Sequence, residues 1–222
     1  MKHFGVIVMK HNNSYLISQG QQYQASSITI EGDYSQAAFF LVAGLIGKQV
    51  YVKGIQPHTK QGDQKIIDIL LEMGGNLTWT EEGIFSSPSD TSGIHIDLKD
   101  IPDLGPILMI LAALSKGKTR FSNVERLKYK ESDRLQTMIH ILHQLGVKTI
   151  YENHILEIEG VRSFKGNIIL SSEDDHRIAM AIAIASIRAE GTITLTQAEA
   201  VRKSYPEFYD VFKSLGGHIH ES

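Results

Sequence analysis

The sequence predicts an α/β (α+β) domain, an inside-out arrangement of three repeated βαβαββ units with buried central helices and outer sheets. Similar segments begin at Gly47, Gly117 and Gly191, an interval of about 70 residues that accommodates a whole supersecondary unit. Each unit also contains a short helix that is apolar on nearly every side. Because such a helix must be buried on every side, we expect the sheets to cover the helices from outside.

The composition is that of an ordinary globular protein and excludes several function classes. The 222 residues are 42% hydrophobic and 21% charged with a net charge of −3, so any recognition of phosphate must be local. The absence of cysteine excludes disulfides, thiolate metal sites and a cysteine nucleophile. No apolar run reaches the ~18 residues that span a bilayer, and Met1–Ser14 lacks the pattern of a signal peptide. We therefore expect a cytoplasmic protein.

The chain is expected to contain two parts of unequal size. Residues 1–27 are predicted to be the tail of a mostly missing N-terminal domain, with strands at Phe4–Met9 and Tyr15–Ser18 joined by a turn at Asn12–Ser14. Residues 28–222 are predicted to form a C-terminal domain, with repeats at about 28–92, 93–160 and 165–222.

The middle repeat contains the full expected order of elements. Its strands and helices are predicted, in order, at Ile94–Leu98, Asp103–Ser115 (helix), Thr119–Asn123, Glu131–Leu145 (helix), Val147–Tyr151 and Ile155–Ile158. The all-apolar helices of the three repeats are predicted at Ala37–Gly47, Ile107–Leu114 and Ile178–Ile187.

Acidic residues precede each buried helix: Asp33 the first, Asp103 the second, and Asp174 with Asp175 the third. Helix capping is sufficient to explain Asp33. If the three helices pack about one axis, their N-termini point to one end of the domain. That end would gather Asp33, Asp103, Lys130, Glu131, Arg134, His176 and Arg177. Helix N-termini combined with lysine and arginine side chains predict an anion-binding site.

The stretch Lys128–Arg134 is the densest group of charges in the chain, because five of its seven residues are ionisable. It precedes an apolar-periodic run that predicts an amphipathic helix, for which Ser132 or Asp133 is a suitable N-cap. A phosphate or carboxylate could bind there beside Glu131. On this stretch alone, a solvated helix start with local ion pairs is an equal alternative.

Five motifs in order along the chain resemble those of EPSP synthases (3-phosphoshikimate 1-carboxyvinyltransferases). They are Gly32–Ala37, Ile101–Asp103, Lys128–Leu135, Asp175–Met180 and Lys203–Phe208. The chain departs from the family at Lys128, where arginine is common, and at Gln36, where serine is common. The resemblance implies two inside-out domains in the whole enzyme. This chain would be the C-terminal half, since the family's N-terminal Gly-Asn-Ser-Gly-Thr motif is missing.

The resemblance also implies a chemistry, which is transfer of the enolpyruvyl group of phosphoenolpyruvate to the 5-hydroxyl of shikimate 3-phosphate with release of phosphate. This reaction belongs to the shikimate pathway of aromatic amino acid biosynthesis, and glyphosate targets the family. The expected partners are the two substrates and the missing N-terminal domain, with no cofactor, metal, nucleic acid or membrane.

The resemblance assigns a role to each matching residue. Asp103 would act at the substrate hydroxyl, Glu131 would move the proton, and His176 would assist as a donor. Arg134 and Arg177 would bind phosphoenolpyruvate, with Lys130 between the substrates. Lys203 is the nearest candidate for a further substrate-binding cation near the C-terminus, although Glu199 is an alternative occupant of the aligned position.

Two other functions are consistent with parts of the pattern. The transferase that acts on UDP-N-acetylglucosamine shares the fold, but it does not carry the motifs at 130–134 and 175–177 in this form. A non-catalytic anion-binding remnant would explain the half-length chain. If the chain is half of a two-domain transferase, we expect it to fold in isolation but to have little or no turnover. Closure of the two domains normally completes such a site.

Overall fold

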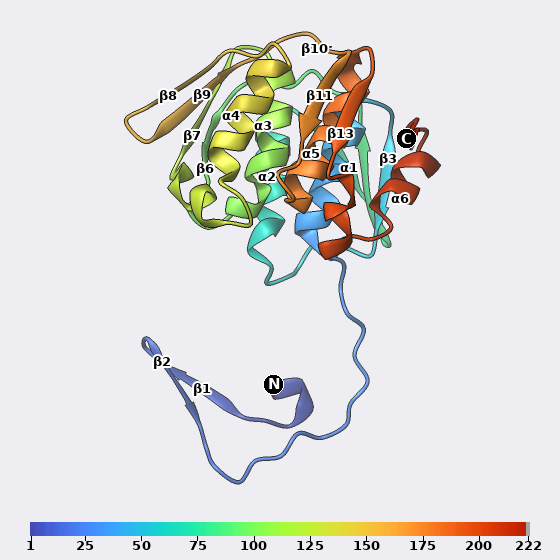
Figure 1. Ribbon diagram of the computed structural model, residues 1–222. Coiled ribbons are helices and arrows are strands. Elements are labelled where there is room, and N and C mark those ends of the chain that lie inside the picture. The colour runs from blue at the N-terminus through green and yellow to red at the C-terminus, as the bar shows by residue number, and fades with distance from the viewer. Residues whose placement is uncertain (221–222) are drawn as a thin grey trace. The chain divides into compact units, whose positions relative to one another are not determined.

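The computed structural model describes residues 1–220, which divide into two compact units, Met1–Glu31 and the part from Gly32 onward (Figure 1). The first unit contains a 3₁₀ helix, η1 (Lys2–Phe4), and two antiparallel strands, β1 (Val8–His11) and β2 (Ser14–Ile17). The predicted hairpin is present.

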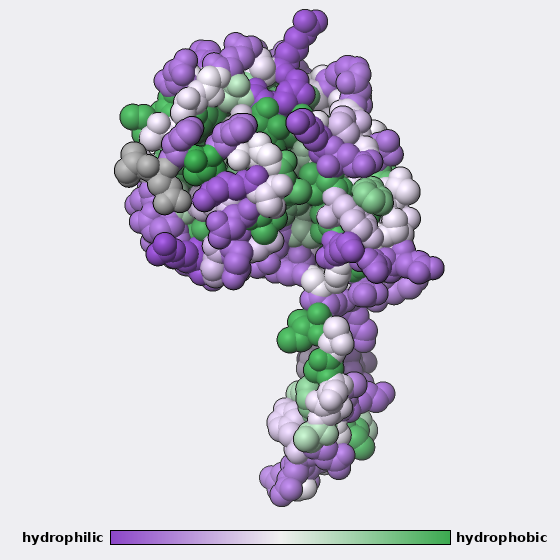
Figure 2. All heavy atoms as spheres, turned by 90° about the vertical axis from the view of Figure 1, so that its right-hand side faces the viewer, coloured by the Kyte–Doolittle hydropathy of each residue, from purple (hydrophilic) through white to green (hydrophobic). Residues whose placement is uncertain are grey.

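The first strand of this hairpin starts later than predicted. Phe4 belongs to η1, which ends at Gly5 with a φ of 79° and a hydrogen bond from its N–H to the carbonyl of Lys2 at 3.1 Å. The backbone therefore becomes extended only after this turn. Among residues 1–31, Val6 is the one buried side chain, and Figure 2 shows hydrophobic side chains at the surface of this unit. So small a buried surface cannot stabilise an independent domain.

The second unit contains the helices and most of the strands. Its α-helices are α1 (Tyr34–Ile46), α2 (Lys65–Glu72), α3 (Gly105–Leu114), α4 (Arg134–Gln144), α5 (His176–Ala185) and α6 (Phe208–Ser214). Its 3₁₀ helices are η2 (Gly62–Gln64), η3 (Pro102–Leu104), η4 (Val124–Tyr129), η5 (Ser186–Arg188) and η6 (Ala198–Lys203). Its strands are β3 (Val50–Lys53), β4 (Asn76–Trp79), β5 (Gly83–Ser87), β6 (His95–Asp97), β7 (Lys118–Ser122), β8 (Thr149–Glu152), β9 (Ile155–Glu159), β10 (Phe164–Lys165), β11 (Ile168–Ser171), β12 (Ala189–Glu190) and β13 (Ile193–Thr196).

Helices α1, α3 and α5 form the centre of this unit and contact one another in every pairing (Figure 1). All their residues are buried except Gln36, Leu114 and Ala183. Outside them, α1 packs on β3 and β5, α3 on β9, and α5 on β13. The predicted inside-out α/β class is therefore confirmed. None of the helices among residues 1–220 is both long enough and apolar enough to cross a membrane.

The outer sheets differ in completeness between the three repeats. The first repeat has the antiparallel order β3-β5-β4, and the second has β6-β7-β9-β8, in which β6 and β7 are parallel. The third has two parallel pairs, β11 with β13 and β10 with β12. Within residues 1–220, the complete order βαβαββ is thus found in the middle repeat, because the first repeat has no paired strand before α1 and the third has none after α6.

A glycine allows the first sheet to approach the central helices closely. The hydroxyl of Ser86 on β5 donates to the carbonyl oxygen of Leu41 in α1 at 2.6 Å. A Cβ atom at Gly44 would lie 2.6 Å from the Cβ atom of Ser86, which is closer than packed atoms can come. The absence of a side chain at this position therefore brings α1 onto β5.

Candidate functional site

The N-termini of the three central helices meet at one end of the second unit. In the first turn of α5, Arg177 donates from Nη2 to the hydroxyl of Ser35 in α1 at 3.0 Å. Its Nε atom lies 3.6 Å from Oδ1 of Asp103, which precedes α3. Asp33 caps α1 by accepting hydrogen bonds from the amide and hydroxyl of Ser35, both at 2.8 Å. The predicted gathering of charges at these helix ends is present, and the capping interpretation of Asp33 is confirmed.

Asp103 lies among three cations that converge on one of its oxygens. Oδ1 is 2.8 Å from Nη1 of Arg134, 3.0 Å from Nζ of Lys130 and 3.6 Å from Nε of Arg177. Burial alone would raise the pKa of Asp103, but the charge of Arg177 and the hydrogen bond and charge of Lys130 outweigh burial and hold this pKa below its usual value. Asp103 is therefore a carboxylate at neutral pH.

Arg134 and Asp175 form a buried ion pair next to Asp103. Nε and Nη2 of Arg134 donate to the two carboxylate oxygens of Asp175 at 2.7 and 3.1 Å, and the two side chains are 2% and 0% exposed. Burial acts to raise the pKa of Asp175, but its bonds with Arg134 hold this pKa below the usual value. Ser132 adds a hydroxyl hydrogen bond to Oδ2 at 3.1 Å. Each guanidinium nitrogen of Arg134 thus faces a carboxylate, and this favours a role in holding the site together.

Glu131 and His176 form a second acid–base pair beside the first. Nδ1 of His176 lies 2.9 Å from Oε1 and 3.0 Å from Oε2 of Glu131. The carboxylate is half-exposed and the imidazole is buried. Glu131 was predicted to begin a helix, but α4 begins later, at Arg134. The carboxylate of Asp133 caps α4 there, because it accepts a hydrogen bond from the Gln136 amide at 3.1 Å.

The ligand atoms of Glu131, Asp175 and His176 lie within 4.8 Å of one another, which is close enough for three ligands of one metal ion. Both oxygens of Asp175, however, already accept hydrogen bonds from Arg134. A metal ion would have to compete with a buried guanidinium for the same carboxylate. Glu131 and His176 are also placed within hydrogen-bond distance of each other, which is the geometry that proton exchange between two side chains requires.

Lys203, at the end of η6, belongs to the outer part of this site. Its Nζ atom is 2.9 Å from Oδ2 and 2.5 Å from the carbonyl oxygen of Asp174. The hydrogen bond with Asp174 raises the pKa of Lys203, and the charges of Glu131 and Asp175 raise it further. Lys203 therefore faces the same end of the domain as the predicted proton-transfer pair, although it does not bond to that pair directly.

Asp63 in η2 is an acidic residue of this region that was not predicted from the sequence. Gln61 fixes η2 to the start of α1, because its side-chain oxygen accepts the Tyr34 amide at 2.9 Å. Burial raises the pKa of Asp63 to about 6, and the negative charge of Asp103 adds to this effect while Arg177 opposes it. The repeat could have revealed Asp63, since it stands just before α2 as Glu131 stands just before α4.

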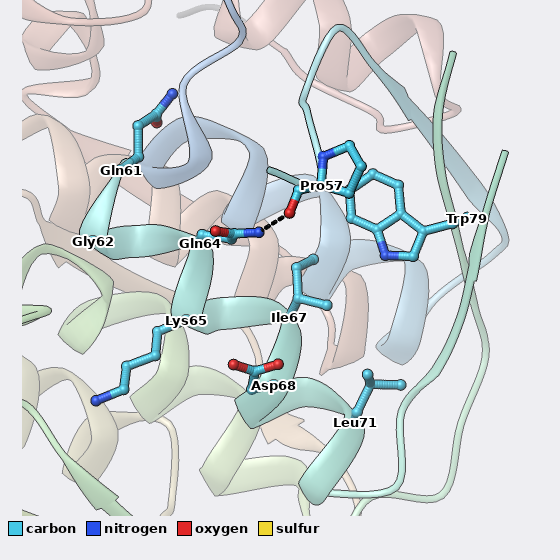
Figure 3. Close-up of a pocket in the computed structure, with 9 residues that line it drawn as sticks. All are labelled: Pro57, Gln61, Gly62, Gln64, Lys65, Ile67, Asp68, Leu71 and Trp79. Carbon is cyan, nitrogen blue, oxygen red and sulfur yellow. Dashed lines mark hydrogen bonds between the residues drawn. The ribbon is translucent and has the colours of Figure 1, made fainter. Parts of the chain in front are cut away.

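A groove of about 470 Å³ lies between α2 and β4, and Gln61 and the η2 residues Gly62 and Gln64 line its end nearer the site (Figure 3). Lys65 and Asp68 from α2 and Trp79 from β4 lie along it. None of the predicted site residues lines this groove. The functional candidates are instead concentrated at the N-termini of the central helices.

The fold of this chain is that of the enolpyruvyl transferases. The structure of an EPSP synthase from Acinetobacter baumannii matches 99% of this chain and 54% of its own, with a TM-score of 0.87 and 30% sequence identity. The enolpyruvyl transferase NikO from Streptomyces tendae matches with a TM-score of 0.79 over 99% of this chain and 52% of its own. At 16% identity, the second match shows a likeness of fold alone.

Sequence comparison identifies the family. The model of the family EPSP synthase (3-phosphoshikimate 1-carboxyvinyltransferase) matches residues 1–212, and the chain belongs to this family. The 3-phosphoshikimate 1-carboxyvinyltransferases of Clostridium acetobutylicum and Clostridium beijerinckii are 43% and 41% identical over 222 and 223 aligned residues. Each alignment covers 100% of this chain and 51% of the relative. The chain thus spans about half the length of the curated relatives it matches.

Proposed function

We propose that this chain is the C-terminal half of a 3-phosphoshikimate 1-carboxyvinyltransferase, and that residues 1–27 are the end of its N-terminal domain. The proposed reaction transfers the enolpyruvyl group of phosphoenolpyruvate to the 5-hydroxyl of shikimate 3-phosphate and releases phosphate. The observation that supports it most is the convergence of Lys130, Arg134 and Arg177 on Asp103, beside the Glu131–His176 pair. Carboxylates and cations in this arrangement can bind two phosphorylated substrates and move protons between them.

In the proposed first step, Asp103 accepts the proton of the 5-hydroxyl as the hydroxyl oxygen bonds to C2 of phosphoenolpyruvate. The cations around Asp103 lower its pKa and make it a weak base in the free chain. Oxyanions of the substrates would draw Lys130 and Arg177 away from Asp103. The pKa of Asp103 would then rise, so that substrate binding itself activates the base.

Glu131 is the proposed proton shuttle at C3 of phosphoenolpyruvate. In its protonated form it gives a proton to C3 as C2 is attacked, which converts the methylene into a methyl group. It then takes a proton back from this methyl group as the C2–O bond to phosphate breaks and the phosphate leaves with the electron pair. His176, within 3 Å of both carboxylate oxygens, would orient Glu131 and exchange protons with it.

The cations have different proposed roles. Arg177 and Lys130 would bind substrate oxyanions directly, because each has a contact with Asp103 that an anion can replace. Arg134, predicted as a phosphoenolpyruvate ligand, would act chiefly by positioning, since it is buried and faces Asp175 and Asp103. Lys203 would supply the additional cation at the edge of the site.

The proposed partner is the N-terminal half of the enzyme, which would close over this site and exclude water. We therefore propose that the isolated chain binds substrates weakly and has little or no turnover. A cytoplasmic location and membership of the enzymes that glyphosate targets belong to the same proposal.

The first experiment is calorimetric titration of the chain with shikimate 3-phosphate up to millimolar concentration. We expect weak binding that is lost in Arg177→Gln. Binding should be unchanged in Asp90→Asn, which removes one partner of an exposed ion pair between Asp90 and Lys116 that is separate from the site. An absence of heat for the unmodified chain would contradict the proposed substrate.

The half length of the chain favours a second candidate, a non-catalytic anion-binding module. Mixing the chain with a separately produced N-terminal half of a relative distinguishes the catalytic half from the non-catalytic module. We expect phosphate release from both substrates in the mixture, and a loss of this activity in Glu131→Gln. A mixture that binds both substrates but releases no phosphate would support the non-catalytic module.

A further inference from the structure

Asp174, which no step of the proposed reaction uses, holds Lys203 with two groups at once. Its carboxylate lies 2.9 Å from Nζ of Lys203, and its carbonyl oxygen accepts a hydrogen bond from the same atom at 2.5 Å. The side chains of Lys203 and Asp174 are 45% and 62% exposed, so this pair lies in contact with solvent. Solvent exposure makes such a pair weak and easily opened.

The backbone at Asp174 has an unusual conformation that serves this contact. Glu173 and Asp174 have φ angles of 51° and 55°, so two successive residues other than glycine adopt the left-handed region. This region is unfavourable for an ordinary residue, although Asp and Asn tolerate it best. In this conformation the carbonyl and the carboxylate of Asp174 reach the same ammonium group.

Hydrogen bonds between two loops maintain this conformation. The hydroxyl of Ser171 accepts from the Glu173 amide at 3.1 Å and donates to the side-chain oxygen of Gln197 at 2.8 Å. The hydroxyl of Ser172 donates to the carbonyl oxygen of Gln197 at 2.9 Å. The loop that follows β11 is thereby fixed to the loop that follows β13 and leads into η6.

The backbone next to Lys203 is fixed from the opposite direction. The side-chain amide of Gln36 in α1 donates to the carbonyl oxygen of Ser204 at 2.7 Å. The base of the lysine side chain is therefore anchored, while its ammonium group has a weak partner. This combination suits a cation that changes partner without moving its backbone.

We propose that Asp174 is a positioning residue that holds the Lys203 ammonium at the edge of the charged site until a phosphate or carboxylate group of a ligand replaces it. The inference rests on the proposed function, because it assumes that the helix N-termini bind an oxyanion. The carboxylate of Asp174 contacts the Lys203 ammonium directly, so it competes with the ligand for Lys203. It also prevents Lys203 from pairing with the nearby Glu131, whose charge acts on the same ammonium group. Asp174 thus lowers anion affinity and keeps the proton shuttle free.

The test uses the complete 222-residue chain and inorganic phosphate as the probe, with affinities measured by NMR titration. Asp174→Asn keeps the carbonyl acceptor and tolerates the left-handed backbone but removes the competing charge. We expect it to bind phosphate about two- to fivefold more tightly. Lys203→Met should bind phosphate about two- to fivefold more weakly. In the Lys203→Met background, Asp174→Asn should have almost no effect, because the competition acts through Lys203.

Two further measurements exclude a merely structural effect. Asp174→Gly, which also fits a positive φ, should reproduce the tighter binding of Asp174→Asn. In Asp174→Asn the pKa of Lys203, followed by NMR at its Cε atom, should fall toward the ordinary lysine value. Asp90→Asn serves as the matched control, because Asp90 pairs with Lys116 at 2.6 Å near the C-terminal end of α1, where the Ser89 amide bonds to the Leu45 carbonyl.

The outcomes distinguish this inference from the proposed function. If the chain and Asp174→Asn bind phosphate equally while Arg177→Gln binds none, the inference is wrong and the anion site stands. If Asp174→Asn tightens binding equally with and without Lys203, Asp174 acts as a general negative charge and the inference is also wrong. If the unmodified chain binds no phosphate, both the anion site and the inference are contradicted.

Discussion

Asp174 and Asp175 are neighbours in the chain, yet their surroundings give them opposite functions. Asp175 is fully buried and holds the buried Arg134 through both carboxylate oxygens, whereas Asp174 is exposed and holds the exposed Lys203. Opening the first pair would leave a buried charge without its partner, and opening the second exposes both charges to water. Burial, and not residue type, therefore separates the fixed framework of the site from the part that can exchange partners.

The largest expected effect follows from breaking the buried pair. Arg134→Met leaves Asp175 and Asp103 without their shared guanidinium, so the free energy of unfolding should fall by about 3–5 kcal/mol. Urea unfolding followed by circular dichroism measures this loss. Lys116→Met, which breaks the exposed pair with Asp90, is the control and should change stability far less. Equal losses in the two variants would remove the distinction between buried and exposed pairs.

A smaller, pH-dependent effect is expected at Asp63. Burial raises its pKa in the folded chain to about 6, so the folded chain holds this proton up to a higher pH than the unfolded chain does. Protonated Asp63 contributes fully to the free energy of unfolding below its pKa in the unfolded chain. This contribution is lost as the pH rises through its folded pKa of about 6. Asp63→Asn should match the unmodified chain near about pH 4 and be about 1–2 kcal/mol more stable at about pH 7, after allowance for solvent screening. A stability difference that does not change with pH would contradict this assignment.

The effect of Asp103 and Asp175 on stability should have the opposite pH dependence to that of Asp63. Their cation partners lower both pKa values despite burial. Their stabilising contribution is complete above the unfolded carboxyl pKa and is lost as the pH falls through the folded values. The unmodified chain should therefore lose stability in acid. Asp175→Asn should reduce this acid dependence, which unfolding experiments at several pH values can measure.

The left-handed backbone conformation at Asp174 can be tested by comparing the stabilities of two variants. Because its φ is 55°, Asp174→Ala should be less stable than Asp174→Gly by about 1 kcal/mol. Thermal unfolding of the two variants gives the difference directly. If alanine were as stable as glycine, the loop would not require the left-handed conformation that brings both acceptors of Asp174 to Lys203.

The smallest expected effect on stability is that of Lys203→Met. The pair with Asp174 is exposed and screened by solvent, so its loss should change the free energy of unfolding less than any of the changes above. The same variant should nevertheless weaken phosphate binding. A loss of stability as large as that of Arg134→Met would make Lys203 part of the framework and would end the contrast between the two aspartates.

The sequence predicted the central helices well because their physical requirement is simple. A helix such as α3, apolar on every side, has no stable arrangement except burial, and nine of its ten residues are buried. Three such helices, one in each repeat, predicted both the inside-out fold and the meeting of their N-termini. The motifs at 130–134 and 175–177 then indicated which charged residues lie there.

The partners of these residues could not be predicted in the same way. Arg134 pairs with Asp175, which is 41 positions away, and this choice depends on how two repeats pack. The start of α4 was misplaced because several residues can cap a helix, and the hydrogen bond of Asp133 decides among them. Asp63 was missed because no local charge cluster marks it, although its position in the repeat matches that of Glu131.

The most direct test of the central claim is heteronuclear NMR of the chain titrated with shikimate 3-phosphate. We predict that amide signals at the N-termini of α1, α3 and α5, together with those around Lys130 and Glu131, shift with one common affinity. Signals that shift instead along the groove between α2 and β4, around Lys65 and Trp79, would contradict an anion site at the helix N-termini.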